Sequence, residues 1–440
     1  MTLIFRETEA ENLSRQLWLS QYKSSRMSLL LGNHATGKTS LAVYCTRTSP
    51  TVYLKMTGRS EALLLTYFKE EVQRVLGVYV PPTVESILEM VSFLLDVSLR
   101  QHFSLILDKI DEYLGKDVER CYPLRKKWDE TKKEGHLNLI LVASSPFVAQ
   151  KLFYLFGSPF TNCLDMEVRV RPFTVAQISS LVSSRGLAAG PADLLALYGA
   201  TGGLPEMVVH MVDAGIVQKD EIVRCCLGGS SFFTKEGERR ILSVLGKTKD
   251  VYLSILQLIS QGYRTQAEIE AHIGGFNVGG HLSKLEVEYG LITKTRPLLA
   301  SESSRNVVRF EITDPFLMTY LRYVESNRAL FDTFNYEEIV EKALQDYPRY
   351  AKVLLCRHFR TRFETEYPGS EIGGDWKAGD PSEIDLMVLD RKDMKVLLSD
   401  IEYGSSDFNK APFLERVNTL KGGPLAGYRI DSRLFTIEDM

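Results

Sequence analysis

One stretch decides the fold: Ser28-Leu29-Leu30-Leu31 runs directly into Gly32-Asn33-His34-Ala35-Thr36-Gly37-Lys38-Thr39. The apolar run is typical of a buried parallel strand. The residues after it fit the pattern G-x-x-x-x-G-K-[ST], and a helical pattern follows from Ser40 to Cys45. A strand, a glycine-rich loop and a helix in this order predict a phosphate-binding loop. The sequence therefore predicts an α/β fold with a parallel sheet.

The residue types in this loop suit the phosphate chain of ATP. Glycines let the backbone turn tightly and aim its N–H groups at phosphate oxygens, beside a helix N-terminus that already favours anions. Lys38 would reach the β- and γ-phosphates, and the Thr39 hydroxyl would ligate Mg²⁺. We therefore expect ATP and Mg²⁺ as cofactors. The predicted nucleotide-binding residues of the loop are Gly32, Asn33, His34, Ala35, Thr36, Gly37, Lys38, Thr39 and Ser40.

An acidic residue at the end of a neighbouring strand is needed to hold the magnesium ion. The apolar run 103–107 ends in Asp108, which we predict to be this carboxylate. Many such ATPases place a glutamate next, as the base that orients the attacking water, but this chain has Lys109. Asp111 and Glu112 follow, and we take Glu112 as the catalytic candidate. The alternative is that both acids belong to a solvated helix start.

Two more strands are expected at residues 51–56 and 138–143. The second ends in Ser144-Ser145, which are polar side chains at the carboxyl end of a buried strand. Ligands of open parallel sheets bind at this edge, so Ser144 is predicted to sense the γ-phosphate. The alternative is that Ser144 caps the next helix.

Several further motifs occur in the order found in one known family. They are Phe5-Arg6-Glu7 with Glu9, then Ala143-Ser144-Ser145, Arg171-Pro172-Phe173 and Tyr198-Gly199-Ala200-Thr201-Gly202-Gly203-Leu204-Pro205-Glu206. With the loop and Asp108, they resemble the archaeal-type ATPase family, a branch of the AAA+/STAND group of P-loop NTPases. The resemblance implies that the Ser144 strand lies between the P-loop strand and the Asp108 strand. It also implies that Arg6 and the helix start at 202–205 lie near the nucleotide.

A small helical module is expected next. Residues 252–259, 265–269 and 278–289 have helical patterns, and 290–294 and 307–312 are typical of two strands. This order fits a winged helix, and the family resemblance places one here. The third helix has few basic residues, and the wing carries more. Whether the module is structural or reads DNA stays open. The basic residues concerned are His281 and Lys284 on the helix and Lys294, Arg296, Arg305 and Arg309 on the wing.

The C-terminal part carries a pattern typical of a carboxylate hairpin. Asp385 lies on its first strand, and Asp400 and Glu402 lie on its second. Together they can gather carboxylates around a divalent metal. The family resemblance implies a restriction-endonuclease-like (PD-D/E-x-K) domain here, with Asp385 and Asp400 as metal-binding acids. The family lysine falls at Glu402 and the upstream glutamate near Cys356, so we expect a retained fold without cleavage; an active nuclease is the alternative.

The composition agrees with a multi-domain globular protein. The chain has 440 residues, with 53 Lys+Arg against 56 Asp+Glu, so a globally basic nucleic-acid coat is excluded. Six scattered cysteines without a C-x-x-C pair indicate free thiols in a reducing compartment. No signal peptide is visible, and the most apolar segment is too short to span a bilayer. We expect a cytoplasmic protein with no membrane partner.

Three domains are predicted from these motifs: an ATPase domain at 1–235 with a helical lid at about 172–235, a winged helix at 236–334 and a nuclease-like domain at 335–440. The leading hypothesis is an ATP-binding and ATP-hydrolysing switch, dependent on Mg²⁺, that couples nucleotide state to the other domains. The alternatives are an ATP-gated nuclease for defence or DNA processing, and a non-hydrolysing scaffold. DNA, another protein and self-association are the candidate partners besides ATP.

Overall fold

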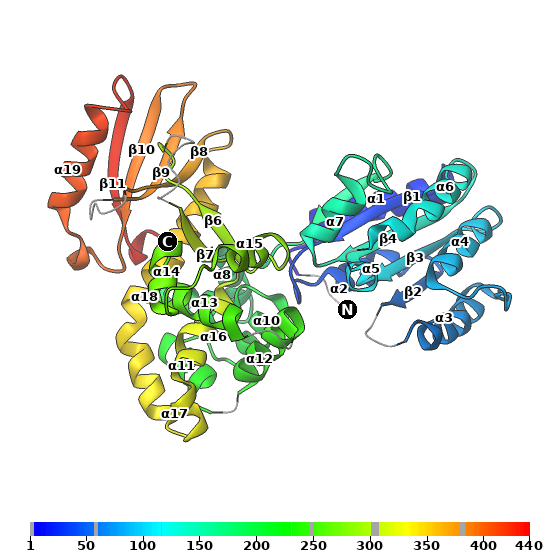
Figure 1. Ribbon diagram of the computed structural model, residues 1–440, viewed down its shortest axis with the longest axis horizontal. Helices are drawn as coiled ribbons and strands as arrows, with labels where there is room; N and C mark the ends of the chain where they lie inside the picture. Colours follow the sequence, from blue (N-terminus) through cyan, green and yellow to red (C-terminus); the bar gives the residue numbers. More distant parts are fainter. Residues whose placement is uncertain are drawn as a thin grey trace. The chain divides into compact units, whose positions relative to one another are not determined.

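The computed structural model describes residues 4–56, 60–115, 117–229, 231–246, 250–300, 308–377 and 383–440. The chain divides into two compact units, Met1–Pro172 and Phe173–Met440 (Figure 1). Each unit has its own core and is described by itself below. No described helix has both the length and the apolar character needed to cross a bilayer. All six cysteines are free thiols.

The first unit is built on a five-stranded sheet. Its strands are β1 (Arg26–Leu31), β2 (Thr51–Lys55), β3 (Phe103–Asp108), β4 (Leu137–Ala143) and β5 (Met166–Arg169). They are all parallel and lie in the order β2-β3-β4-β1-β5. The predicted placement of the Ser144 strand, β4, between the P-loop strand and the Asp108 strand is therefore confirmed. Strand β5, which lies at the edge of the sheet beside β1, was not predicted from the sequence.

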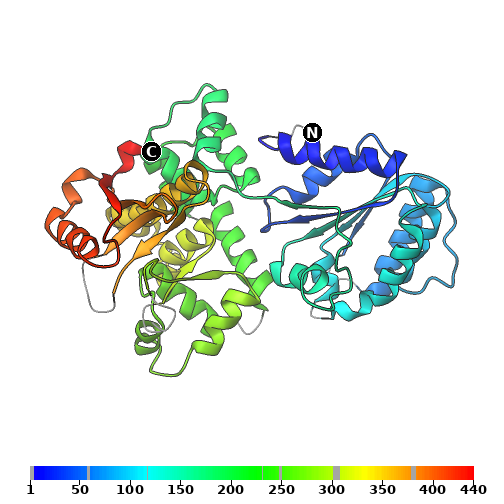
Figure 2. The ribbon, with the colours of Figure 1, turned by 90° about the horizontal axis from the view of Figure 1, so that it is seen from above.

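Helices cover both faces of this sheet because alternate residues of each buried strand point to opposite sides. Leu30 packs with side chains of α1 (Glu7–Tyr22) and α2 (Lys38–Thr46), whereas Leu29 and Leu31 belong to the core on the other face. The ribbon shows helices on both faces of the sheet (Figure 2). Both faces of the sheet are therefore covered by apolar side chains. The polar side chains that could bind a ligand lie at the carboxyl ends of the strands. The helices are α1 (Glu7–Tyr22), α2 (Lys38–Thr46), α3 (Glu61–Leu76), α4 (Ile87–Val97), α5 (Ile110–Leu114), α6 (Tyr122–Thr131) and α7 (Pro146–Phe153).

The second unit begins with a run of helices and a small hairpin. The helices are α8 (Val175–Ser184), α9 (Pro191–Thr201), α10 (Pro205–Asp213), α11 (Lys219–Leu227), α12 (Phe232–Leu245), α13 (Asp250–Gln261), α14 (Gln266–His272) and α15 (Gly279–Val287). The antiparallel strands β6 (Ile292–Thr295) and β7 (Arg309–Ile312) follow. Helices α13–α15 with β6 and β7 have the predicted order of a winged helix. Helix α14 begins with a capping box, in which the Thr265 hydroxyl accepts from the Glu268 N–H and the Glu268 side chain accepts from the Thr265 N–H.

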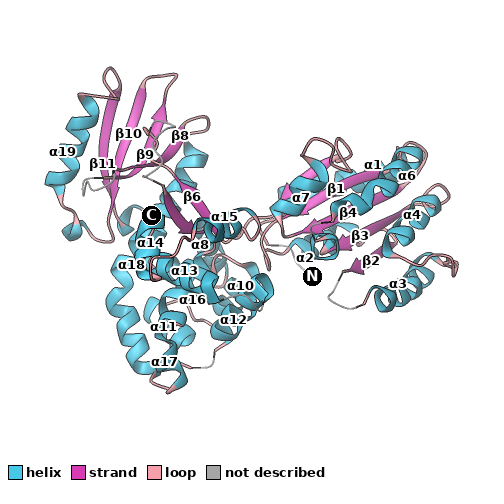
Figure 3. Cartoon of the chain, viewed as in Figure 1, coloured by secondary structure: helices cyan, strands magenta, loops and turns pink. Residues whose placement is uncertain are grey.

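The C-terminal part carries a second sheet. After α16 (Pro315–Tyr323), α17 (Arg328–Asp332) and the long α18 (Tyr336–Glu366) come β8 (Glu371–Asp375), β9 (Ile384–Asp390), β10 (Lys395–Ile401), α19 (Lys410–Lys421) and β11 (Arg429–Phe435). The sheet order is β11-β10-β9-β8, with β10 and β11 parallel and the other neighbours antiparallel (Figure 3). The predicted hairpin is present as β9 and β10, whereas β8, α19 and β11 were not predicted.

Contacts made by α18 and by the segment after β6 connect the parts of the second unit. Its Arg357 donates to the main-chain oxygens of Ile312 and Thr313 at the end of β7. Leu298, in the segment after β6, packs against the core of the second sheet, and its N–H donates to the Gly374 oxygen at 2.9 Å. The winged-helix elements and the second sheet therefore belong to one compact unit. The division into domains at residues 235 and 335 stays a prediction.

Candidate functional site

The loop between β1 and α2 has a backbone that only particular residues allow. Gly37 is the N-cap of α2 and has φ +90°, a left-handed conformation that favours glycine. At Gly32 a Cβ atom would overlap the main-chain oxygen of Val170, which follows β5. Both glycines of the motif are thus required by the way the loop folds. Ala35 also has a positive φ, of 60°, so the loop curls tightly in front of α2.

Lys38 lies at the centre of this loop. Its side chain is buried, and its Nζ atom donates to the main-chain oxygens of Gly32 at 2.6 Å and Asn33 at 2.7 Å. Burial lowers the pKa of Lys38 to about 8, and the charges of Asp111 and Asp108 oppose this shift. The ammonium group is therefore charged at neutral pH and is held inside the loop, at the N-terminus of α2, where anions are favoured.

The two predicted magnesium ligands are neighbours. The Thr39 hydroxyl, in the first turn of α2, donates to Oδ2 of Asp108 at 3.0 Å, and Asp108 is the buried last residue of β3. A hydroxyl and a carboxylate in contact are hard oxygen donors of the kind that Mg²⁺ prefers. Tyr53 of β2 donates to the same Oδ2 atom at 2.6 Å. The donor set and the glycine cradle thus fit Mg²⁺ bound to a phosphate chain.

No sequence pattern marks the role of Tyr53. Strand β2 pairs in register with β3, and Lys55 lies opposite Asp108. The Tyr53 hydroxyl reaches the carboxylate from this neighbouring strand. The sequence alone does not say which strands are adjacent, so only the sheet order makes this contact visible.

Asp111 connects the end of β4 to the start of α5. Its Oδ2 atom accepts hydrogen bonds from the main-chain N–H groups of Ser144 at 2.9 Å and Ser145 at 2.8 Å. Its other oxygen, Oδ1, is buried and has no hydrogen-bond partner among the described residues. The Ser145 hydroxyl, not that of Ser144, caps α7 by accepting from the Val148 N–H. The residue that caps α7 is therefore Ser145 and not Ser144. The role of Ser144 as a γ-phosphate sensor stays a prediction.

Glu112 lies at the rim of the loop. Its Oε1 atom is 2.5 Å from Nζ of Lys109 and 3.8 Å from Nε2 of His34, which belongs to the P-loop. Lys109, at φ +63°, is the N-cap of α5 and places these acids directly after β3. Burial and the charges of Lys38 and Lys109 lower the pKa of His34. The structure thus brings Glu112 to the P-loop, in an exposed ion pair.

Arg6 contacts the P-loop through its guanidinium group. Its guanidinium group is buried and donates to the main-chain oxygens of Thr36 at 3.4 Å and Arg171 at 2.5 Å. It also pairs with Glu9 at 3.4 Å. The contact with Thr36 places Arg6 beside the loop that the sequence predicts to bind nucleotide. Through this contact it holds the backbone of the loop.

The acids of the second sheet are gathered around a lysine. Nζ of Lys352, on α18, lies 3.0 Å from Oδ2 of Asp385, 2.8 Å from Oε1 of Glu402 and 3.8 Å from Oδ1 of Asp400. Burial, the hydrogen bond that protonated Asp400 donates to Asp385, and the negative charge of Asp385 together raise the pKa of Asp400 to about 8. Within the described ranges, no group of three or more His, Cys, Asp or Glu side chains is arranged to hold a metal ion. The predicted acids thus meet, but around an ammonium group.

The basic residues of the wing are divided. Arg309 pairs with Glu383 at 2.8 Å and lies over the Trp376 ring, and so is turned toward the second sheet. Lys294, Arg296 and Lys284 are exposed. Arg305 lies outside the described residues. A DNA-reading role for the module stays a prediction.

Comparisons with known proteins agree with this geometry at the level of fold. No known family model and no curated protein matches the sequence. Among solved structures, the Walker-type ATPase of Pyrococcus abyssi matches with a TM-score of 0.50 and 18% identity, over 72% of this chain and 96% of that one. This likeness shows a shared fold, in which a parallel sheet carries the P-loop between its first strand and the following helix. The ORC2 protein of Aeropyrum pernix, in ADPNP and ADP complexes, is similar with a TM-score of 0.48 and 14% identity, over 78% and 95% of the two chains.

Proposed function

We propose that the first unit binds ATP with Mg²⁺ and hydrolyses it, and that nucleotide state acts as a switch for the second unit. The observation that carries the proposal is the contact of Thr39 with Asp108 at 3.0 Å, beside the buried Lys38 and inside a loop that needs glycine at positions 32 and 37. A glycine-rich turn without a phosphate-binding role would have no need of this arrangement of cation, hydroxyl and carboxylate.

Each side chain has a defined task in this proposal. Lys38 supplies a fixed positive charge at the N-terminus of α2, where the phosphate chain would lie. Thr39 and Asp108 would hold Mg²⁺, which when bound neutralises charge on the phosphate oxygens. Tyr53 orients Asp108 by donating to its Oδ2 atom. Asp111 holds the Ser144 main chain in place, so that the Ser144 hydroxyl stays at the end of β4.

Phosphate release by the full-length protein tests the proposal. With Mg²⁺ present, we expect ATP turnover that disappears on chelation with EDTA. The assay is repeated with duplex DNA, because the winged-helix elements make DNA a candidate effector. Tight ATP binding without any phosphate release would instead support the non-hydrolysing scaffold.

Replacing Glu112 by Gln is expected to slow ATP turnover about 100-fold and to leave ATP affinity within about threefold, because a positioned general base contributes roughly 10²–10⁴ in rate. Steady-state turnover and ATP titration measure the two effects. Glu119→Gln is the matched control, since Glu119 is exposed on the segment after α5. Full turnover in Glu112→Gln would remove this residue from the mechanism and leave Asp111 as the carboxylate to examine.

We further propose that the second sheet retains a nuclease-like fold without cleavage activity. Lys352 fills the space between Asp385, Asp400 and Glu402, where an active site would hold a divalent cation. Since the ammonium group contacts these acids and offsets part of their negative charge, it competes with Mg²⁺ or Mn²⁺ for them.

Supercoiled plasmid, linear duplex and single-stranded DNA are therefore all expected to stay intact after incubation with the protein and either metal ion. The assay is gel electrophoresis over hours, with and without ATP. Cleavage that is lost in Asp385→Ala would contradict this proposal and would support the ATP-gated nuclease.

A further inference from the structure

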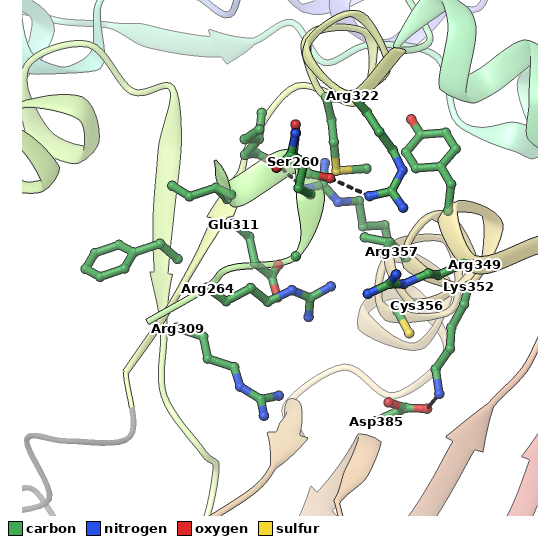
Figure 4. A pocket seen from close by; sticks show the side chains of 18 of the residues that line it. Ser260, Arg264, Arg309, Glu311, Arg322, Arg349, Lys352, Cys356, Arg357 and Asp385 are labelled. Carbon is green, nitrogen blue, oxygen red and sulfur yellow. Dashed lines mark hydrogen bonds and ion pairs between the residues drawn. The ribbon is translucent and has the colours of Figure 1, made fainter. Parts of the chain in front are cut away.

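The second unit contains a cavity of about 320 Å³ that is rich in arginine. It lies among α13 and the residues after it, β7, α18 and the start of β9 (Figure 4). Seven cationic side chains line it against four carboxylates, an excess of three positive charges. The chain as a whole has a formal charge of −3. The local excess is therefore a property of this cavity and does not follow from the overall composition.

Ion pairs account for part of this cationic lining. Arg322 pairs with Asp346 at 2.5 Å, and Lys352 pairs with Asp385 at 3.0 Å. The other pairs join Arg309 to Glu383 at 2.8 Å and Arg360 to Glu311 at 3.5 Å. These residues are held in place by protein partners and define the walls.

Arg264 and Arg349 are different. In the part of the chain that the structure describes, neither guanidinium group has a hydrogen bond or an ion pair. Figure 4 shows both side chains pointing into the cavity, Arg264 from the segment after α13 and Arg349 from α18. The main chain of Arg264 is fixed, since its N–H donates to Glu268 at 2.9 Å and its oxygen accepts from the Phe310 N–H at 2.7 Å.

The electrostatic effect of the arginines is visible on a carboxylate that they surround. Burial raises the pKa of Glu311, but the charges of Arg360, Arg357 and Arg264 outweigh it and hold that pKa below its usual value. A field that stabilises one buried anion also favours a second one in the adjoining space.

We propose that this cavity binds a small ligand that carries two or more phosphate groups. Guanidinium groups match phosphate oxygens in a planar, bidentate geometry. The guanidinium groups of Arg264 and Arg349, which have no protein partner among the described residues, suit two phosphates of one ligand. The volume is at the lower end of the roughly 300–1,000 Å³ that is typical of small-molecule sites. A nucleic-acid duplex is far larger than this space.

A ligand in this cavity would contact several elements of the second unit at once. Arg264 precedes α14 of the winged-helix elements, Arg349 lies on α18, and Asp385 lies on β9 of the second sheet. A ligand held by both arginines would join the winged-helix elements to α18. Binding is therefore expected to raise the melting temperature of the second unit.

Calorimetric titration with inorganic pyrophosphate and tripolyphosphate tests the proposal. The full-length Lys38→Ala protein is used, so that binding at the P-loop is weakened. We expect saturable binding to one site per chain. The double variant Arg264→Gln/Arg349→Gln in this background is expected to bind at least 30-fold more weakly, since a charged hydrogen bond is worth roughly a factor of ten or more. Arg185→Gln is the matched control, because Arg185 is an exposed residue of the same unit that pairs with Asp213.

Two results would overturn the proposal. The first is no binding of either anion, or binding that the double variant leaves unchanged while its melting temperature shows that it is folded. The second comes from a parallel titration with a short DNA duplex: binding of the duplex that depends on Arg264 and Arg349, without binding of the free anions, would assign these arginines to nucleic-acid phosphates.

Discussion

ATP affinity is expected to fall about 100-fold when Lys38 is replaced by Ala. Lys38 is the buried cation at the centre of the loop, and its Nζ atom lies within 2.7 Å of the Gly32 and Asn33 oxygens. Removing one charged contact to phosphate costs about 3 kcal/mol, which corresponds to roughly a factor of 100 in affinity. Fluorescence or calorimetric titration with ATP and Mg²⁺ measures the change.

The matched control for this result is Lys133→Ala. Lys133 is exposed in the same unit, so the substitution removes the same charge without touching the loop. The melting temperature of Lys38→Ala shows whether its unit is folded. Equal ATP affinity in folded Lys38→Ala and in the wild type would contradict the assignment of the loop as a phosphate-binding site.

Replacing Asp108 by Asn is expected to reduce ATP turnover at least 100-fold while ATP affinity changes much less. Asp108 is buried at the end of β3 and accepts from both Thr39 and Tyr53. An amide keeps the shape of the side chain but removes the negative charge that would hold Mg²⁺. Loss of charge stabilisation by the metal is worth several kcal/mol in the transition state, and about 3 kcal/mol is already more than 100-fold in rate.

Turnover at increasing Mg²⁺ concentration distinguishes this effect from simple unfolding. A weakened metal site should recover part of its rate at high Mg²⁺, whereas an unfolded unit should not. Asp117→Asn, at an exposed aspartate of the first unit, is the control. Wild-type turnover by Asp108→Asn would show that another carboxylate carries the metal.

The parts of the fold that could be predicted are those that the sequence marks locally. Strands β1, β3 and β4 are continuous apolar runs because both faces of the sheet are buried. β5 has only four residues, and just one of them is buried. β11, Arg429–Phe435, has no fully buried residue, so neither periodicity nor hydrophobicity marks it as a strand. Such strands form because a neighbouring strand offers hydrogen bonds.

Some residues of the candidate site could likewise be predicted from local sequence, and others could not. The P-loop is contiguous, so its residues follow from the motif, and Asp108 follows from the apolar run before it. Tyr53 reaches the site only through the pairing of β2 with β3. Lys352 enters the acidic cluster from α18, far from Asp385 in the sequence. Contacts of this kind depend on tertiary structure, and no local pattern announces them.

The arginine-rich cavity could not be predicted for a related reason. Arg264, Arg309 and Arg349 are scattered along the chain between acidic residues, and the formal charge of −3 hides any local excess. In the folded protein Arg309 forms an ion pair with Glu383, whereas the side chains of Arg264 and Arg349 point into the cavity. The overall charge thus excludes a basic coat but says nothing about a basic pocket.

The central claim is that the first unit binds ATP at the P-loop, and calorimetric titration of the wild-type full-length protein with ATP and Mg²⁺ tests it most directly. We expect saturable binding of one ATP per chain at this site, weakened about 100-fold by Lys38→Ala. Absence of saturable ATP binding to folded wild-type protein, or binding that Lys38→Ala leaves untouched, would contradict it.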